Sequence, residues 1–242
     1  MPGIVASSQT TYRRYVTGTG IITVVNYSTI FFDLDDTLYP ASSGLWHEIK
    51  DRIGLYMGQK LDIPQEQIQP LRRQLFEEYG TTLRGLQAAY NIDAVDYLAF
   101  VHDVPLADYI QPNPVLTSVL ANLPCRKFIF TNADDKHARR VLQTLQIEQY
   151  FEGIIDILSV SPYCKPMPPA FKIALETAGN PDPHRCVMID DLPHTIRVAR
   201  ELGLFSILYG SDMSEPGFEA NATLADWGKL PELLTGGTNH ES

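Results

Sequence analysis

The sequence contains few cysteines and no long apolar run. Its 242 residues include three cysteines (Cys125, Cys164 and Cys186), which cannot all pair and show no C-x-x-C spacing. No stretch approaches the roughly 18 to 20 apolar residues that span a bilayer, and the first 26 residues do not resemble a signal peptide. These absences predict a reduced, cytoplasmic protein without a membrane partner.

Positive charge is also scarce, because 19 Lys and Arg residues face 29 Asp and Glu residues, a formal charge of −10. A surface this acidic repels phosphate backbones, so the composition predicts no nucleic-acid partner. Hydrophobic residues make up 44% and charged residues 20%, as in an ordinary globular protein. The chain is long enough to bury its own core. We therefore expect an enzyme or binding protein for small molecules.

Five short apolar runs, each followed by polar or turn residues, are typical of buried parallel strands. The stretches that separate the later runs place apolar residues at helical spacing. This alternation predicts an α/β, Rossmann-like, doubly wound fold with a mainly parallel sheet of five or more strands. In such sheets ligands bind beyond the carboxyl ends of the strands. The predicted strands cover residues 29–32, 127–130, 154–158, 186–189 and 205–208.

Residues 40–111 interrupt the alternation with four successive helical patterns. We expect a small helical bundle, inserted after the first strand and lying over the ligand site. The predicted organisation is an N-terminal extension (1–26) with an edge strand through residues 21–25, a core (27–39 and 112–242) and a helical cap (40–111).

Acidic side chains follow the first predicted strand, where Asp33 and Asp35 stand two residues apart. One carboxylate at such a position can attack a substrate while the other acts as general acid and base. Acidic residues that merely stabilise a turn are the alternative. Thr131 closes the second predicted strand and Lys165 lies in a later loop. Both could bind a phosphoryl group; the alternatives are a helix cap for Thr131 and a solvated side chain for Lys165.

A second acidic pair, Asp190 and Asp191, ends the fourth predicted strand. Adjacent carboxylates are costly to bury unless a cation neutralises them. Four aspartates and one lysine would give the site a charge of −3, which would repel a phosphate. A divalent cation is therefore required, and ligands that are all oxygen atoms favour Mg²⁺.

In their order and strand context, these residues resemble the four motifs of the haloacid dehalogenase superfamily. The resemblance spans about residues 28–210 and places the insertion where that family carries its type C1 helical cap. It implies that Asp33 forms an aspartyl-phosphate and that Asp35 is the acid/base. It also implies phosphoryl binding by Thr131, Asn132 and Lys165, and Mg²⁺ binding by Asp33, the Asp35 carbonyl and the pair Asp190 and Asp191, with Asp191 favoured as the direct ligand.

Four segments (31–40, 79–86, 131–142 and 163–166) are similar to the pyrimidine 5′-nucleotidase branch of that superfamily. This narrower resemblance implies a phosphatase of pyrimidine nucleoside 5′-monophosphates. We expect the protein to be a monomer or homodimer. The alternatives are a phosphatase of another small metabolite (a sugar or vitamin-precursor phosphate), a phosphomutase and a catalytically silent binding protein. A carbon–halogen hydrolase is disfavoured, because a halide leaving group needs no proton from Asp35.

The predicted cap carries six basic and ten acidic residues, so nothing in its net charge favours a polyanionic leaving group. Tyr39, Thr81, Thr82 and Arg84 are the candidate substrate contacts, and one or two cap aromatics could stack on a nucleobase. Where the family often has a small residue and then an Asn, this chain has Leu192 and His194, which either reaches the site or is exposed. The other five histidines show no metal-ligand spacing and are interpreted as ordinary.

Overall fold

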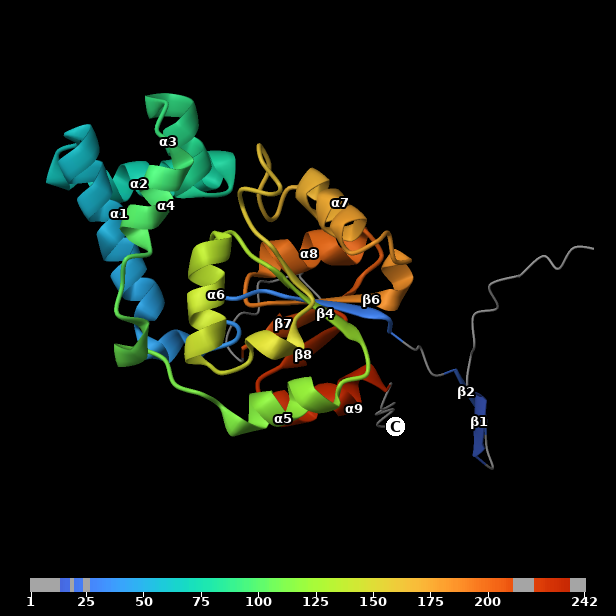
Figure 1. The fold of residues 1–242 in the computed structure, drawn as a ribbon. Helices are drawn as coiled ribbons and strands as arrows, with labels where there is room; N and C mark the ends of the chain where they lie inside the picture. Colours follow the sequence, from blue (N-terminus) through green and yellow to red (C-terminus); the bar gives the residue numbers. More distant parts are fainter. Residues whose placement is uncertain (1–13, 18–19, 24–26, 211–219, 236–242) are drawn as a thin grey trace, which may run out of the picture.

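A parallel six-stranded sheet forms the centre of the protein (Figure 1). The computed structural model describes residues 14–17, 20–23, 27–210 and 220–235. The strand order is β5-β4-β3-β6-β7-β8, and the predicted Rossmann-like α/β fold is confirmed. The strands are β3 (Thr29–Phe32), β4 (Arg126–Phe130), β5 (Gly153–Ile155), β6 (Cys186–Asp190), β7 (Phe205–Tyr209) and β8 (Ala222–Leu224).

Helices cover both faces of the sheet, because alternate residues of each buried strand point to opposite sides. Ile30 and Phe32 pack into the larger apolar cluster, with helices α5 (Pro114–Asn122), α6 (Asp135–Thr144) and α9 (Leu230–Leu234). Phe31 packs into the second cluster, with α7 (Pro168–Thr177) and α8 (Pro193–Glu201). Short 3-10 helices cover Ala41–Ser43, Leu106–Asp108, Glu148–Tyr150, Pro183–Arg185 and Trp227–Lys229.

Four helices between β3 and β4 stand beside the sheet (blue to green in Figure 1), and we call them the helical insertion. They are α1 (Leu45–Leu61), α2 (Gln65–Tyr79), α3 (Thr82–Tyr90) and α4 (Ala94–Val101). Helices α2 and α3 approach closely at Gly85, where an added Cβ would lie 2.6 Å from the Leu75 Cβ. None of the described helices combines the length and apolar character needed to cross a membrane.

Three elements differ from the sequence predictions. The strand predicted over residues 154–158 ends at Ile155, because the Asp156 carboxylate accepts the backbone N–H groups of Ser159 (2.8 Å) and Asp135 (3.0 Å) and so stabilises a turn. The edge strand predicted over residues 21–25 is wrong. Its described part belongs to β2 (Gly20–Thr23), which pairs antiparallel with β1 (Arg14–Thr17) in a separate sheet, and residues 24–25 lie outside the described residues. Strand β8 was not predicted, because three residues show too little alternation.

The chain order of the strands reverses between β3 and β6, which lie side by side. From β3 the chain continues outward through β4 and β5, and β6, β7 and β8 extend the sheet in the other direction. A crevice forms where the order reverses, at the carboxyl ends of the strands. Asp33 directly follows β3 and Asp190 ends β6, so the fold itself brings these two carboxylates together.

Candidate active site

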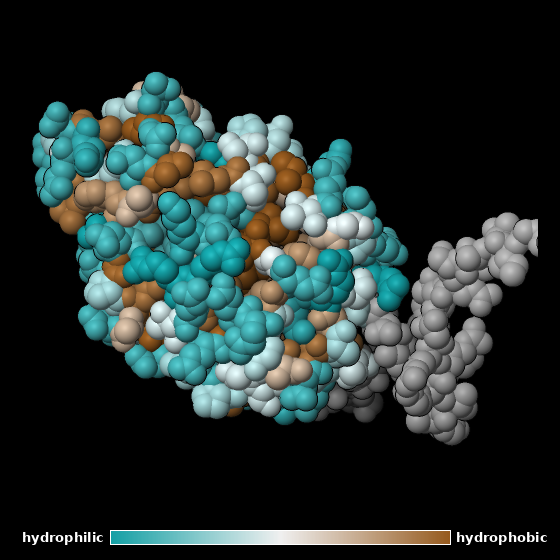
Figure 2. All heavy atoms as spheres, viewed as in Figure 1, coloured by the Kyte–Doolittle hydropathy of each residue, from teal (hydrophilic) through white to brown (hydrophobic). Residues whose placement is uncertain are grey.

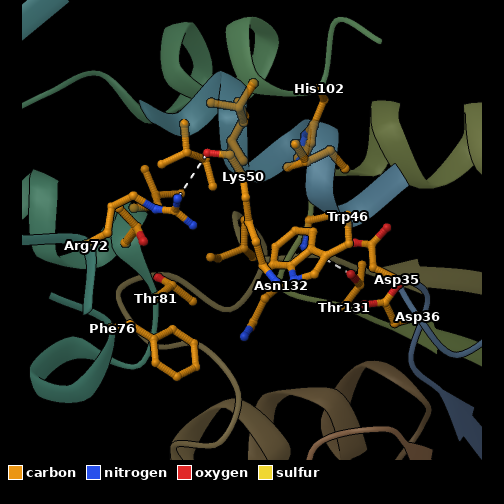
Figure 3. Close-up of a pocket in the computed structure, with 18 of the residues that line it drawn as sticks. Asp35, Asp36, Trp46, Lys50, Arg72, Phe76, Thr81, His102, Thr131 and Asn132 are labelled. Carbon is orange, nitrogen blue, oxygen red and sulfur yellow. Dashed lines mark hydrogen bonds between the residues drawn. The ribbon is translucent and has the colours of Figure 1, made fainter. Parts of the chain in front are cut away.

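A cavity of about 510 Å³ lies between the carboxyl ends of the strands and the helical insertion (Figure 3). On the sheet side, which we call the floor, it is lined by Asp33, Asp35, Asp36, Thr131, Asn132, Ala133, Lys165, Asp191 and Leu192. The side formed by the insertion, which we call the roof, includes Trp46, Lys50, Arg72, Arg73, Phe76, Thr81, Thr82, Tyr97 and the adjoining His102. In Figure 2 an apolar band of surface runs where the insertion meets the rest of the molecule.

Lys165 joins the predicted nucleophile, Asp33, to Asp190, one of the predicted metal ligands. Its Nζ lies 2.6 Å from Asp33 Oδ1 and 2.6 Å from Asp190 Oδ2, and the lysine is only 3% exposed. Burial lowers the pKa of Lys165, but Asp190 and Asp33 outweigh this and hold it above the usual value. The Thr37 hydroxyl donates to the other Asp33 oxygen at 3.0 Å. Lys165 is therefore a buried cation within the site and not a solvated loop lysine.

The remaining negative charge on the floor is poorly compensated. Burial and the neighbouring Asp190 raise the pKa of Asp33 to about 7, although Lys165 opposes this. Burial, Asp33 and Asp190 raise the pKa of Asp191 to about 9. Both groups thus hold their protons more tightly than an ordinary carboxyl group, because they are buried and because the floor holds more carboxylates than Lys165 alone can neutralise.

The donor set fits a divalent metal. Carboxylate oxygens of Asp33, Asp190 and Asp191 lie within 4.8 Å of one another, and hard oxygen donors suit Mg²⁺. The Asp190 oxygens already accept from Lys165 Nζ and from the Leu192 backbone N–H (2.9 Å). Among the described residues the Asp191 carboxylate has no hydrogen-bond partner, which leaves it available to a metal. Its role as a ligand, like that of the Asp35 carbonyl, stays a prediction.

Asp35 is held by two side chains that the sequence analysis did not connect with it. Tyr39 Oη donates to Asp35 Oδ1 at 2.6 Å, and His137 Nε2 lies 3.2 Å from the same oxygen. Burial raises the pKa of Asp35, but His137 and Tyr39 together bring it below the usual value. The Tyr39 pKa is well above normal, because the ring is buried beside Asp35. Both contacts are on one oxygen, and the other carboxylate oxygen, which has no hydrogen-bond partner among the described residues, is available for proton exchange.

His137 and His102 form a buried pair behind Asp35. Their rings stack with centroids 4.1 Å apart, and His102 Nδ1 lies 3.1 Å from Asp134 Oδ2. Burial and His137 lower the pKa of His102, which favours a neutral ring. The interpretation of these two histidines as ordinary was wrong. A signal existed for His137, which follows Thr131 closely in the first turn of α6, but none for His102, which reaches the site from the end of the insertion.

Thr131 and Asn132 lie at the end of β4 beside the cavity. Thr131 Oγ1 accepts the Ala133 N–H at 2.9 Å, so its own hydrogen can be donated to a ligand. The cap of α6 is Asp134, not Thr131. The Asn132 side chain exchanges two hydrogen bonds of 2.9 Å with the Lys165 backbone. Asn132 thus fixes the position of Lys165, and its amide nitrogen keeps a second hydrogen for the predicted contact with phosphate.

The predicted substrate contacts of the insertion divide into two groups. Thr81 and Thr82 line the cavity. Tyr39 and Arg84 are not among its lining residues: Tyr39 is bound to Asp35, and the Arg84 guanidinium donates to the backbone carbonyls of Ile157 (2.6 Å) and Tyr163 (2.8 Å). Arg84 therefore fastens the insertion to the sheet domain. His194 is half-buried and packs edge-to-face against Phe76, with centroids 6.1 Å apart.

Comparison with known proteins is consistent with this arrangement. Residues 27–203 match the haloacid dehalogenase-like hydrolase family. The chain belongs to this family. Since the match contains β3 to β6 and the whole helical insertion, it covers the floor and the roof of the cavity together. The hydrolase is similar in sequence to phosphate metabolism protein 8 of Saccharomyces cerevisiae, with 29% identity over 193 residues. That alignment covers 74% of this chain, and the chain spans only 60% of the yeast protein.

Solved structures of low sequence identity share the fold of this hydrolase. L-2-haloacid dehalogenase from Xanthobacter autotrophicus, with chloropropionic acid covalently bound, gives a TM-score of 0.60 at 14% identity, covering 88% of this chain and 100% of that chain. The magnesium-bound HAD-hydrolase YfnB from Bacillus subtilis gives 0.57 at 17% identity (86% and 99% covered). A HAD phosphatase from Thermococcus onnurineus gives 0.57 at 18% identity (86% and 98% covered).

Proposed function

We propose that this hydrolase is a Mg²⁺-dependent phosphomonoesterase that works through an aspartyl-phosphate on Asp33. The observation that carries the proposal is the floor of the cavity, where a buried carboxylate is bound to a buried ammonium group and lies beside a second, separately held carboxylate. Nucleophile, cation and acid/base are the groups that phosphoryl transfer requires.

In the first step an Asp33 oxygen attacks phosphorus and the ester P–O bond breaks. Asp35 gives a proton to the departing alcohol oxygen. Lys165 and the Thr131 hydroxyl offset negative charge on the phosphoryl oxygens. Resting Asp35 favours the carboxylate form, but an arriving phosphate dianion raises its proton affinity, because a nearby negative charge disfavours ionisation.

In the second step Asp35, now a carboxylate, removes a proton from water as the water oxygen attacks phosphorus. The bond between phosphorus and Asp33 breaks, and inorganic phosphate leaves. Tyr39 and His137 stabilise the carboxylate form of Asp35, which is the form that this step needs. An acid/base of this kind serves an alcohol leaving group and is superfluous for a halide, which supports a phosphate ester over a carbon–halogen bond.

Asp33, Asp190 and Asp191 would hold Mg²⁺, together with the Asp35 carbonyl. Bound there, the ion would offset the charge of the phosphoryl group and of the acidic floor. The elevated pKa values of Asp33 and Asp191 support this assignment, because a cation would remove the repulsion that contributes to them.

For the substrate we propose a pyrimidine nucleoside 5′-monophosphate. Support comes from the resemblance of four segments to pyrimidine nucleotidases and from the cavity, whose roof offers the rings of Trp46 and Phe76. Aromatic rings stack well on a nucleobase. A sugar or vitamin-precursor phosphate would use the same floor and differ only in its contacts with the roof.

The test is phosphate release from nucleoside monophosphates, sugar phosphates and p-nitrophenyl phosphate, with Mg²⁺ and with EDTA. Metal-dependent release that favours uridine and cytidine 5′-monophosphates would support the whole proposal. Metal-dependent release that favours sugar phosphates would support the phosphatase mechanism and contradict the proposed nucleotide substrate. Absence of release from every ester by folded protein would contradict the phosphatase activity.

A further inference from the structure

Basic residues of the insertion gather at the cavity, although the segment as a whole is acidic. Residues 40–111 contain six basic and ten acidic side chains; three of the basic ones (Lys50, Arg72 and Arg73) line the cavity, and none of the acidic ones does. The negative net charge of residues 40–111 therefore does not describe the charge that the roof presents to the cavity. Its own charged groups, all within a segment that the structure describes completely, are cations only.

Arg72 is the most constrained of these cations. Its Nη1 donates to the Lys50 backbone carbonyl at 3.1 Å (Figure 3), whereas its Nε is buried and has no hydrogen-bond partner in the described part of the chain. No carboxylate of the described residues lies within ion-pair distance of this guanidinium. A buried donor without a partner is unfavourable, and a guanidinium stays charged at physiological pH. Nη2 also forms no hydrogen bond in the described part of the chain, so the guanidinium at the cavity wall keeps donors for an acceptor that the described residues do not supply.

The surroundings of Arg72 suit the body of a leaving group. Trp46 and Phe76 line the same cavity, and Figure 3 shows Arg72 and Phe76 entering from α2, away from Asp35 and Asp36. The Lys50 ammonium lies 5.4 Å from the centroid of the Trp46 ring; it forms no ion pair with a carboxylate of the described residues, although its charge opposes the burial that raises the pKa of Asp36. An ester whose phosphoryl group lies on the floor would extend its leaving group between these rings towards the roof.

We propose that Arg72 is a specificity residue, whose guanidinium binds an oxygen acceptor on the leaving group of the substrate. The inference rests on the proposed phosphatase function and names the feature by which the roof selects among phosphate esters. The shared chemistry is an oxygen acceptor, which is either a ring carbonyl or a carboxylate. Esters without such an oxygen would bind through the phosphoryl group and apolar contacts alone.

The experiment compares kcat/KM of the native protein, Arg72→Met and Arg72→Lys on two matched pairs of esters. Uridine 5′-monophosphate against ribose 5-phosphate tests a ring carbonyl, and 4-carboxyphenyl phosphate against phenyl phosphate tests a carboxylate. We expect Arg72→Met to lower kcat/KM about 10- to 100-fold, mainly through KM, on the acceptor-bearing member of at least one pair. For the ester of that pair that lacks the acceptor, kcat/KM should change less than about twofold, because Arg72 makes no hydrogen bond to it.

Lys60→Met is the matched control, because it removes one exposed cation from the same insertion outside the cavity. It should leave both pairs unchanged. Arg72→Lys keeps the charge but lacks the planar donor set, so it should recover only part of the loss. If Arg72→Met unfolds, Arg72→Lys alone decides the question through the same substrate comparison.

An equal loss on both members of both pairs would overturn the proposal, since Arg72 would then support the fold and not the selection. Unchanged kinetics on all four esters would overturn it as well. Failure of the phosphatase proposal looks different, because the native protein would then hydrolyse none of them. In that case, binding of uridine 5′-monophosphate and of 4-carboxyphenyl phosphate is measured by calorimetry. Equal affinity of native protein and Arg72→Met for both, or no binding of either, would overturn the Arg72 assignment separately.

Discussion

The floor and the roof of the cavity differ in how their charged groups are paired. On the floor Lys165 contacts two carboxylates at 2.6 Å each, and a third carboxylate, Asp35, accepts from Tyr39 and lies against His137. On the roof Arg72 donates to one backbone carbonyl, and its Nε has no partner in the part of the chain that the structure describes. A network whose groups hold one another in place suits chemistry that is the same for every substrate. Unsatisfied donors suit recognition, which is completed only when a substrate arrives.

The largest expected effect on activity comes from a substitution on the floor. Asp33→Asn removes the nucleophile but keeps the size of the side chain, so we expect kcat to fall at least about 1,000-fold on every ester alike. The measurement is phosphate release from the substrate panel. Activity retained by a folded Asp33→Asn variant would refute the assignment of the nucleophile.

The attachment between floor and roof should matter for stability. Arg84→Met would leave the buried Ile157 carbonyl and the part-buried Tyr163 carbonyl without a donor from the insertion, which we expect to lower the free energy of unfolding by about 2–3 kcal/mol. Urea denaturation measures this. The control is Arg139→Met, which breaks exposed ion pairs with Asp135 and Glu148 and should cost less than about 1 kcal/mol. Equal losses in the two variants would argue against a special role for Arg84.

The histidine pair tests whether the orientation of Asp35 limits the chemistry. His137→Leu removes the group beside Asp35 Oδ1, and we expect kcat to fall about 10- to 100-fold with little change in KM. His137→Gln can place an amide N–H near the position of Nε2, so it should recover much of the loss. An increase in KM with unchanged kcat, or no recovery of kcat in His137→Gln, would show that His137 does not act through Asp35.

A smaller effect concerns pH and metal. In metal-free protein the folded-state pKa values of Asp33 (about 7) and Asp191 (about 9) exceed the ordinary value of 3.8. The folded state therefore binds more protons than the unfolded state above pH 3.8, and stability falls as pH rises through this window, by at most about 1.4 kcal/mol per pH unit for each group. The pKa of His102 is below its usual value of 6.5, so its contribution to stability rises as pH rises around that value.

Stability with and without Mg²⁺ is best compared between about pH 7 and about pH 9, because an ordinary histidine titrates below this interval. We expect the urea midpoint in EDTA to fall across this interval and the fall to be smaller with saturating Mg²⁺. Asp191→Asn should flatten the EDTA curve. A midpoint that rises with pH in EDTA would contradict the crowding of acids on the floor.

Much of the floor could be predicted from the sequence, because its residues directly follow strands and the topology brings strand ends together. Asp33, Thr131 and Asp190 needed only the strand assignments. The roof could not be predicted in the same way. Arg72 and Lys50 are ordinary helical cations in the sequence, and their neighbourhood depends on how α1 and α2 pack. Arg84 lies in the first turn of α3 and faces the sheet domain, so sequence position alone could not separate it from Thr81 and Thr82, which line the cavity.

The histidine pair shows the same limit. His137 and His102 are 35 residues apart and belong to different parts of the fold, so neither shows a spacing that marks a site. Only the tertiary contact, with ring centroids 4.1 Å apart, connects them to Asp35. Strand β5 was predicted too long for a local reason, since the apolar character of residues 154–158 continues through a turn made by the Asp156 side chain.

The most direct test of the central claim is to trap the covalent intermediate. Protein turning over a phosphate monoester with Mg²⁺ is quenched, reduced with borohydride and digested, and the peptide containing Asp33 is analysed by mass spectrometry. The account predicts conversion of Asp33 to homoserine, the reduction product of an aspartyl-phosphate, and no conversion in Asp33→Asn or without substrate. Conversion at another aspartate, or turnover with Asp33 unmodified under conditions that trap a control acyl phosphate, would contradict it.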